Sequence, residues 1–368
     1  MKKFIIIEHE PLTIRLKNIW NIDTLLKKGV DIEYWDMSSF IYPGISIPNK
    51  VKDECVRTID SLETLEFFLS NNDSTQTVYA IELFPNWDNR KIFHLLRRHK
   101  CRCIKIDLYA NTSLTTSLRK RIISFLKRIS ISSLTKKTLW LCYRILFLKK
   151  IYTYNLSSSS IVAPDIRINH PDFELFKQEE HPLITIGYIL FIDTFYPLHP
   201  DLKYYYNFKN ITEYTDSYRH LMISFFDYLE NKYNKRVVIA AHPKSNYSGN
   251  EFGEREIIRH NTCNLIKYAD FIVTHESNSM SFIALANKPF VIVFPDSYTQ
   301  FSTLINYVFL LAKVCGKTAY NLDKDNWDSI SFSKMDEKTR LNYIETYLTS
   351  KETENKKNAD IWIENLLM

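Results

Sequence analysis

Three segments in the second half of the chain place polar, titratable side chains directly after short apolar runs. The runs ILFI, VVIAA and FIV lead into Asp193, into His242, and into Thr274, His275 and Glu276. A carboxylate can take a proton from an attacking hydroxyl group, and an imidazole can stabilise negative charge on a departing phosphate. These residue types at three run ends therefore suit the displacement of a phosphorylated leaving group.

The third run is followed by a helical pattern that begins with serines. Ser277, Asn278 and Ser279 fall in its first turn, where hydroxyl groups lie beside free backbone N–H groups and the positive end of the helix dipole. The chain has 6 glycines and contains neither GxGxxG nor GxxxxGK followed by Ser or Thr, so a glycine-rich phosphate loop is not expected. We predict instead that His242, Lys244 and this turn hold a phosphate.

Each of these residues also has an ordinary structural interpretation. An aspartate after a strand is commonly a turn or capping residue, serines commonly cap helices, and His-Pro occurs four times in this chain. The combination of a carboxylate, an imidazole and serines on successive strand ends is what favours a functional site.

The segments that must position these residues alternate between strand-like and helix-like patterns. KKFIIIEH, VDIEYWDM, TVYAIELF and RCIKIDLYA are runs of strand length separated by helical patterns, one of which we expect to be a single helix over 12–29. The second half repeats the alternation, with a helix expected over 212–233. Such alternation predicts parallel sheets with helices on both faces, whose strands end at a common edge where ligands bind.

The length of 368 residues suits two such domains. We predict an α/β protein with two Rossmann-like domains that face an interdomain cleft, a basic helical insertion and a helical C-terminal tail. The domains are placed at 1–160 and 161–335, and the tail, which we expect to pack across both domains, at 336–368. Four serines at 157–160, with prolines nearby, predict a linker or an irregular crossing between the domains.

Composition and motif counts exclude several classes of protein. Six cysteines are scattered without a disulfide framework or a zinc pattern, so we expect reduced thiols and no metal site. The apolar run near the N-terminus is four residues long, which is too short for a signal peptide, and no apolar window is long enough to span a membrane. We therefore expect a cytoplasmic protein.

The order of the three motifs resembles the nucleotide-binding half of GT-B glycosyltransferases that use CMP-activated sugars. These are the bacterial sialyltransferases and the β-Kdo and other nonulosonic acid transferases. FIDTFY stands where those families have an acidic motif, AAHPKS where they have His-Pro, and THESNSMS where they have a serine-rich helix start, with spacings of about 50 and then 35 residues. The resemblance covers roughly 183–300, and the first half is similar only at the level of fold.

The resemblance implies roles for the individual residues. Asp193 would be the general base of an inverting, metal-independent transfer, and His242 would contact the CMP phosphate. Ser277 and Ser279 would contact phosphate or ribose, in a nucleotide site that also includes Lys244, Glu276 and Asn278. The acidic motif of those families has two adjacent acidic residues followed by glycine, whereas Thr194 follows Asp193 here. Asp201 in LHPDL is therefore the alternative base.

The first domain would then bind a variable acceptor. Glu8 and His9 end its first predicted strand, and Glu82 ends a later one, so all three are candidates for acceptor binding together with Asp201. Ordinary turns at strand ends are the alternative interpretation. We expect no cofactor, since the nucleotide sugar would be a substrate.

One segment holds the basic excess of the whole chain. Between Leu114 and Lys150 there are ten Lys or Arg residues and no Asp or Glu, so that the remainder of a chain with net charge +6 carries −4. Cationic clusters mixed with Ile, Leu, Phe and Trp are typical of helices that lie on anionic membrane surfaces. We therefore predict peripheral attachment through 114–150 to the inner face of the cell membrane, and no nucleic-acid partner. A solvated basic face is the alternative.

These observations predict a glycosyltransferase that moves a sugar onto a surface-polysaccharide or lipid-linked glycan, as in the synthesis of capsule or lipopolysaccharide. The donor expected from the resemblance is a CMP-linked nonulosonic acid or Kdo. A UDP-sugar, a GDP-sugar or CDP-glycerol on the same fold is the first alternative. A non-catalytic protein that binds membranes or nucleic acid through the basic segment is the second.

Overall fold

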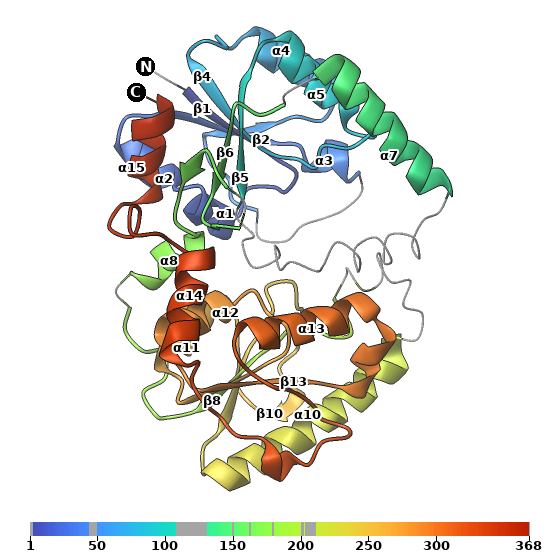
Figure 1. Ribbon diagram of the computed structural model, residues 1–368, viewed down its shortest axis with the longest axis vertical. Helices are drawn as coiled ribbons and strands as arrows, with labels where there is room; N and C mark the ends of the chain where they lie inside the picture. The colour runs from blue at the N-terminus through green and yellow to red at the C-terminus, as the bar shows by residue number, and fades with distance from the viewer. Residues whose placement is uncertain are drawn as a thin grey trace. The chain divides into compact units, whose positions relative to one another are not determined.

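The computed structural model describes residues 3–43, 50–107, 131–148, 151–161, 163–178, 180–199, 202 and 211–367 (Figure 1). The chain forms two compact units, the first made of 1–171 and 349–368 and the second of 172–348. The tail that we expected over 336–368 is thus shared between the two units. Of the basic segment, residues 114–130 and 149–150 lie outside the described residues.

The first unit is built on a parallel sheet with strand order β3-β2-β1-β4-β5-β6-β7. Its strands are β1 (Lys3–Glu8), β2 (Asp31–Asp36), β3 (Val56–Thr58), β4 (Thr77–Glu82), β5 (Arg102–Asp107), β6 (Tyr154–Ser157) and β7 (Ile166–Arg167). Its helices are α1 (Ile14–Ile19), α2 (Ile22–Lys27), α3 (Ser38–Ile41), α4 (Leu62–Ser70), α5 (Arg90–Arg98), α7 (Ile131–Tyr143) with the π-helical turn η2 (Arg144–Leu148), and α15 (Asn358–Trp362) with the π-helical turn η5 (Ile363–Leu367).

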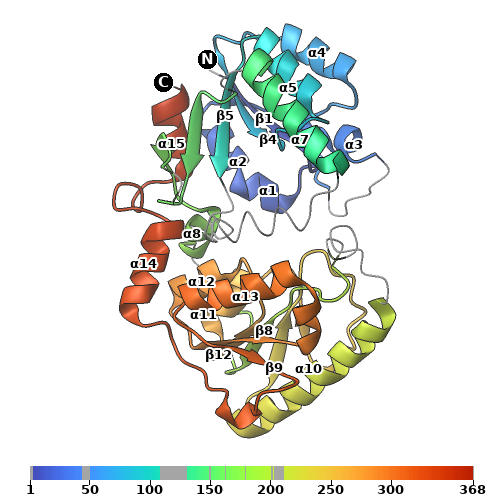
Figure 2. The ribbon, with the colours of Figure 1, turned by 45° about the vertical axis from the view of Figure 1, so that its right-hand side comes forward.

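Both faces of this sheet are buried. Along β1, Phe4 and Ile6 belong to a core under α1, α2 and α15, whereas Ile5 and Ile7 belong to a core under α4 and α5 (Figures 1 and 2). A strand that is covered on both faces needs an uninterrupted apolar run, which explains the FIII sequence. The last helix closes the first of these cores, because the ring of Trp362 stacks on Phe4 at a centroid distance of 5.9 Å.

The single helix expected over 12–29 is wrong. The chain forms α1 and α2, separated at Trp20 and Asn21, and Asn21 adopts a left-handed φ of 51°. Asparagine tolerates this conformation better than most residues. The break allows the fully buried Trp20 ring to contact Trp362 at 6.1 Å.

The linker expected at the four serines is also wrong. The first of these serines ends β6, which pairs with β5 and β7 and extends the first sheet, and the other three follow it inside the first unit. Ser157, Ser158 and Ser159 are buried, and the Ser157 hydroxyl donates to Asp107 Oδ2 at 3.0 Å. Buried serines are compatible with a strand when their hydroxyl groups find partners of this kind.

The second unit has a parallel sheet with strand order β11-β9-β8-β12-β13-β14. Its strands are β8 (Ile189–Ile192), β9 (Val237–Ala240), β10 (Glu251–Glu254), β11 (Ile257–Ile258), β12 (Phe271–Thr274), β13 (Phe290–Phe294) and β14 (Ala319–Asn321), of which β10 lies outside the sheet. Its helices are α8 (Pro171–Phe176), α10 (Ile211–Tyr233), α11 (Thr262–Tyr268), α12 (Met280–Ala286), α13 (Ser302–Val314) and α14 (Glu337–Tyr347), with 3-10 turns η3 (Asp296–Gln300) and η4 (Trp327–Ser329). The helix expected over 212–233 is confirmed by α10.

Within the described part of the chain, every helix is too short or too polar to cross a lipid bilayer.

The packing of α15 on the first sheet leads to a stability prediction. We expect Trp362→Ala to lower the free energy of unfolding by about 3–5 kcal/mol, because it removes a fully buried ring and leaves a cavity beside Phe4 and Trp20. Urea denaturation followed by circular dichroism measures the change. Ile14→Ala is the matched control, since Ile14 is 70% exposed in the same unit. Equal stability of the two variants would show that the C-terminal segment does not contribute to this core.

Candidate functional site

The parallel register of the second sheet brings the predicted residues to one edge. Ile192 at the end of β8 lies between Ala240 of β9 and Thr274 of β12. The residues that follow these three strands, including Asp193, His242 and Glu276, therefore start from the same edge of the sheet. Adjacent strands are separated by about 4.8 Å, so the ends of β9 and β12 lie about 10 Å apart on either side of β8.

Asp193 is buried and both of its carboxylate oxygens accept hydrogen bonds. Oδ1 accepts from Phe195 N at 2.9 Å, while Oδ2 accepts from His242 N at 3.2 Å and from the Tyr247 hydroxyl at 2.9 Å. Burial raises the pKa of Asp193 to about 6, although these hydrogen bonds favour the ionised form. The Asp193 carboxylate thus joins the loop after β8 to the loop after β9, which gives it a positioning function.

His242 presents a neutral N–H group at the end of β9. Its Nδ1 accepts a hydrogen bond from the backbone N–H of Lys244 at 3.1 Å, which places the proton of the neutral ring on Nε2. Burial, helped by the nearby charges of His199 and Lys244, lowers the pKa of His242 to about 4. The ring is parallel to that of Phe195 at a centroid distance of 6.4 Å. Among the described residues, no hydrogen bond uses Nε2, and the His199 ring lies edge-on to the His242 ring at a centroid distance of 4.9 Å.

The turn before α12 holds the remaining predicted nucleotide contacts. Ser277 Oγ accepts from the backbone N–H of Ser279 at 3.2 Å, and its hydroxyl proton stays available for donation. Glu276 Oε2 is buried and has no hydrogen-bond partner among the described residues. Burial raises the pKa of Glu276 to about 8, so this side chain is a protonated carboxyl at neutral pH. Asn278 and Lys244 are exposed.

His275, which lies in the same motif, supports the structure instead. It is fully buried, its Nδ1–H donates to the Val293 carbonyl oxygen at 2.6 Å, and its Nε2 accepts from the Tyr218 hydroxyl at 2.8 Å. Burial lowers the pKa of His275 to about 4, which keeps the ring neutral. Both ring nitrogens are therefore used in fixing β12 to β13 and α10.

Two tyrosines of this site were missed by the sequence reasoning. Tyr247 contacts Asp193 across 54 residues of sequence, and Tyr218 contacts His275 across 57. Tyrosine is common in this chain, with 23 copies, and neither residue stands in a recognisable motif. Only the folded chain identifies them.

The first unit also places titratable residues at the carboxyl ends of its strands. Glu8 ends β1 and is buried, and His9 Nδ1 lies 2.7 Å from both Glu8 Oε1 and the carbonyl oxygen of Glu82. Burial alone would lower the pKa of His9, but the hydrogen bond to Glu8, the negative charge of Glu8 and the Glu82 carbonyl raise it to about 9. The pair is therefore an imidazolium held by a carboxylate.

Glu82 lies beside this pair at the end of β4. Its Oε1 is buried without a hydrogen-bond partner among the described residues, and burial together with the Glu8 charge raises the pKa of Glu82 well above its usual range. The exposed rings of Tyr42 and Phe84 flank His9 at centroid distances of 6.0 and 6.4 Å. The sequence had indicated Glu8, His9 and Glu82, and the structure brings these three together. Asp201 lies outside the described residues.

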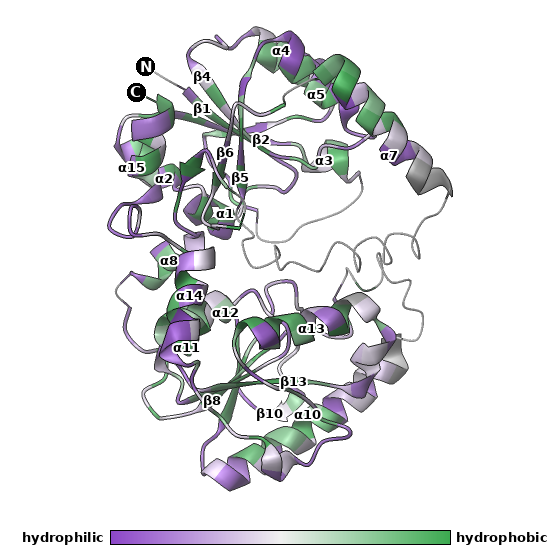
Figure 3. Cartoon of the chain, viewed as in Figure 1, coloured by the Kyte–Doolittle hydropathy of each residue, from purple (hydrophilic) through white to green (hydrophobic). Residues whose placement is uncertain are grey.

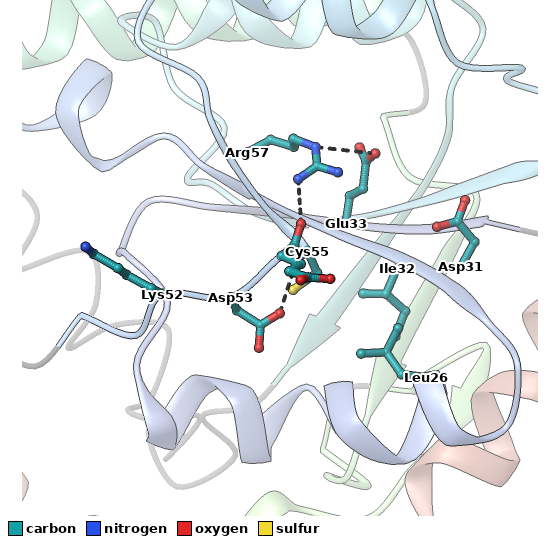
Figure 4. A pocket seen from close by; sticks show the side chains of 9 residues that line it. Leu26, Asp31, Ile32, Glu33, Lys52, Asp53, Cys55 and Arg57 are labelled. Carbon is teal, nitrogen blue, oxygen red and sulfur yellow. Dashed lines mark hydrogen bonds and ion pairs between the residues drawn. The ribbon is translucent and has the colours of Figure 1, made fainter.

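The pocket shown in Figure 4 is not part of either strand-end site. It has a volume of about 560 Å³ and lies at the amino ends of β2 and β3, where Asp31, Glu33 and Asp53 line it. Its charges are compensated within the protein, since Lys3 Nζ lies 2.9 Å from Glu33 Oε1 and Lys17 Nζ lies 2.7 Å from Asp53 Oδ2. Among the described residues, no group of three or more His, Cys, Asp or Glu side chains is arranged to hold a metal ion.

Comparison with known proteins identifies the fold. No protein-family model and no curated protein matches the sequence. Among solved structures, the chain is similar to the wall teichoic acid polymerase TagF, with 11% identity, a TM-score of 0.51, and coverage of 95% of this chain and 86% of that one. It is also similar to a UDP-GlcNAc 2-epimerase from Methanocaldococcus jannaschii, with 12% identity, a TM-score of 0.48, and coverage of 98% of this chain and 95% of that one. The spinosyn forosaminyltransferase SpnP shows 11% identity, a TM-score of 0.47, and coverage of 100% of this chain and 98% of that one. The predicted α/β fold of GT-B type, with two Rossmann-like units, is confirmed.

The hydrogen bonds of Asp193 predict its effect on stability. We expect Asp193→Ala to lower the free energy of unfolding by about 2–4 kcal/mol, because the buried donors that it satisfies lose their acceptor. Tyr247→Phe removes one of these donors and is expected to cost about 1 kcal/mol. Urea denaturation of both variants measures these two losses of stability. Equal losses would show that the contacts of Asp193 with Phe195 and His242 do not stabilise the protein.

The environment of His242 predicts its protonation state. In long-range proton–nitrogen correlation spectra, we expect the His242 ring to be the neutral Nε2–H form from about pH 8 down to about pH 5.5, because its pKa is lowered to about 4. The His242→Gln variant assigns the signal. A midpoint at or above about pH 6.5, the ordinary value for histidine, would contradict the burial of the ring.

Proposed function

We propose that the chain is an inverting glycosyltransferase that moves a sugar from a nucleotide-activated donor to a glycan acceptor. The main observation behind this proposal is the position and the neutral state of the His242 ring at the end of β9. A neutral N–H donor, clamped at the end of β9 by its backbone contact with Asp193, lies at the same sheet edge as the serine turn before α12. Ligands of open α/β sheets bind at this edge.

In this proposal the second unit binds the donor. The His242 Nε2–H, the Lys244 ammonium group and the hydroxyls of Ser277 and Ser279 contact the phosphate, on which negative charge grows as the bond to the sugar breaks. A neutral imidazole stabilises that charge as a hydrogen-bond donor, so it needs no proton from solvent. The span of about 10 Å between the ends of β9 and β12 accommodates a phosphate and an adjoining ribose. Glu276, as a protonated carboxyl with an unpartnered oxygen, both donates to and accepts from ribose hydroxyl groups.

The role of Asp193 in this proposal differs from the general base that the sequence indicated. Its two oxygens already accept hydrogen bonds from Phe195, His242 and Tyr247, so we assign it the positioning of His242. Proton acceptance then falls to another carboxylate. Asp201 is one candidate from the sequence.

We assign the acceptor to the first unit. The Glu8–His9 pair offers fixed hydrogen-bond partners for sugar hydroxyl groups, and the exposed rings of Tyr42 and Phe84 offer an apolar surface on which a sugar ring can pack. Glu82, whose Oε1 is buried without a hydrogen-bond partner among the described residues, is a further candidate for contacts with the sugar hydroxyl groups of the acceptor. The acceptor class that we propose is a surface polysaccharide or a lipid-linked glycan at the inner face of the cell membrane.

The donor that we propose from the motif order is a CMP-linked nonulosonic acid or Kdo. A UDP-sugar, a GDP-sugar or CDP-glycerol is the alternative. All of these share the phosphate and the ribose that His242, Glu276 and the serine turn are assigned to contact. The base and the length of the phosphate chain therefore separate the donors by experiment.

The test is a thermal-shift screen with CMP, CDP, UMP, UDP, GDP and dTDP. A nucleotide present at about 100 times its dissociation constant stabilises the folded state by about 2.7 kcal/mol, which is a readily measured shift. We expect one of these nucleotides to stabilise the wild type and the shift to be lost in His242→Ala. His181→Ala is the matched control, because it alters an exposed His-Pro dipeptide of the same unit.

The outcomes distinguish the donors. Stabilisation by UDP or GDP supports a UDP- or GDP-sugar donor. Both a CMP-linked sugar and CDP-glycerol release CMP, so stabilisation by CMP without CDP supports the nonulosonic acid or Kdo donor, and stabilisation by CDP as well as CMP supports CDP-glycerol. A shift that persists in His242→Ala would remove His242 from the site. No shift with any of the six nucleotides would contradict the transferase proposal.

A further inference from the structure

A group of large apolar side chains is exposed along α7 and η2 of the first unit. Leu139, Leu141, Ile145, Leu146 and Phe147 are between 42% and 68% exposed. Figure 3 shows the hydrophobic stretch at the end of this helix that leads into η2. Soluble monomeric proteins rarely present a contiguous apolar surface of this kind unless something binds it.

The opposite side of the helix is anchored, which fixes these residues in an outward position. The Trp140 ring packs against Phe93 of α5 at 6.2 Å, and the Tyr143 hydroxyl lies 3.0 Å from His94 Nδ1. Leu148 is buried in the core, and its carbonyl oxygen accepts a hydrogen bond from Arg97. Because the inner residues are held by α5, a rotation of α7 that buries the outer ones would break these contacts.

Basic residues flank the apolar group. Lys137, Leu141 and Ile145 are spaced four residues apart and so share one side of the helix, and Arg144 lies next to them. All four residues are exposed. On α5, Lys91 is also exposed. The face thus has an apolar centre with cations at its border.

The apolar surface continues into a groove between α4, α5 and α7. This groove has a volume of about 660 Å³. Leu62, Phe67, Leu95 and Tyr143 form its apolar lining, and Glu63, Glu66, Lys91 and Arg98 line it as charged residues of both signs. Phe67 on α4 is itself exposed. We call the exposed side of α7 and η2 the α7 face, and the groove borders it. The helices α4, α5 and α7 lie on one side of the first sheet, as Figures 1 and 2 show.

The charge of the α7 face decides between the possible occupants. A second copy of the chain related by twofold symmetry would place the cations of the two faces near one another, which opposes association. A nucleic acid would neutralise the cations but would leave the apolar centre without a partner. An anionic lipid surface provides partners for the cations and for the apolar centre. Its phosphates contact the Lys and Arg side chains, while the apolar side chains enter the zone between the headgroups.

We infer that the α7 face binds an anionic phospholipid surface, with Leu141, Ile145 and Leu146 inserted between the headgroups and with Lys137 and Arg144 on the lipid phosphates. This inference names the binding element and the lipid chemistry, and it holds whether or not the chain is a transferase. It requires neither a donor nor an acceptor.

The experiment is co-sedimentation of the full chain with vesicles of two compositions, phosphatidylcholine alone and phosphatidylcholine mixed with phosphatidylglycerol. We expect binding to the mixed vesicles that is at least about tenfold tighter than to the neutral ones and that weakens as salt is raised. Ile145→Glu should lower the affinity for mixed vesicles about tenfold or more, since it puts a charge where an apolar side chain enters the headgroup zone. Ile14→Glu, on α1 of the same unit, is the matched control and should bind as the wild type does, because Ile14 is 70% exposed and lies outside the α7 face.

A double variant, Lys137→Gln with Arg144→Gln, tests the electrostatic part without adding an acidic group. We expect it to lose most of the preference for phosphatidylglycerol while keeping the wild-type circular dichroism spectrum. The inference is overturned if the wild type ignores the mixed vesicles or if Ile145→Glu binds them as well as the wild type does. It is also overturned if light scattering shows a wild-type dimer that Ile145→Glu converts to a monomer. Nucleotide-induced thermal shifts are measured without lipid, so a failure here is separate from a failure of the transferase proposal.

Discussion

The contact between the Asp193 carboxylate and the backbone of His242 organises the edge of the second sheet. Loops that leave neighbouring parallel strands have no ladder of hydrogen bonds to hold them together, and each would otherwise move independently. A buried carboxylate that accepts from Phe195 on one loop and from His242 and Tyr247 on the other removes that freedom. The orientation of the His242 ring then follows, because Nδ1 is occupied by the Lys244 backbone and the ring lies parallel to Phe195. A site whose geometry is fixed before the ligand arrives loses less entropy on binding.

At this edge, burial raises the pKa of the acid and lowers the pKa of the histidine, and both changes favour the neutral form of the side chain. It raises the pKa of Glu276 and lowers the pKa of His242, so that each side chain is neutral and each can donate a hydrogen bond at neutral pH. An anion therefore meets donors at Glu276 and His242 rather than a carboxylate. In the first unit, His9 is instead kept as an imidazolium because Glu8 lies within hydrogen-bond distance, while burial and the Glu8 charge raise the pKa of Glu82 beside them. The difference between His242 and His9 depends on whether a carboxylate reaches the ring.

The positions of the strands could be predicted from sequence because a parallel strand buried on both faces must be a continuous apolar run, as FIII of β1 and ILFI of β8 are. Strand ends then located Asp193, His242 and Glu8. The break at Asn21 could not be predicted, because the helical pattern continues through it and the cause is the tertiary contact between Trp20 and Trp362. The hydrogen bond between Asp193 and Tyr247 was missed for a related reason. The two residues are 54 positions apart in the sequence, and a hydrogen bond across such a separation leaves no local sequence pattern.

The four serines at the end of β6 and the basic helix α7 show that the same composition can belong to different structures, depending on what surrounds the residues. The four serines have the composition of a linker, yet Ser157 is paired to Asp107 inside a sheet, so that local polarity gave the wrong element. In α7 the mixture of cations and apolar residues is equally ambiguous by itself, since either side of such a helix can face the protein. Once Trp140, Tyr143 and Leu148 are seen to hold the helix from within, the remaining apolar residues are left outside. Removing an apolar side chain such as Ile145 from water lowers the free energy, but α7 cannot bury Ile145 by turning, because its inner side is anchored. A partner on the outer side of α7 is the remaining way to cover it.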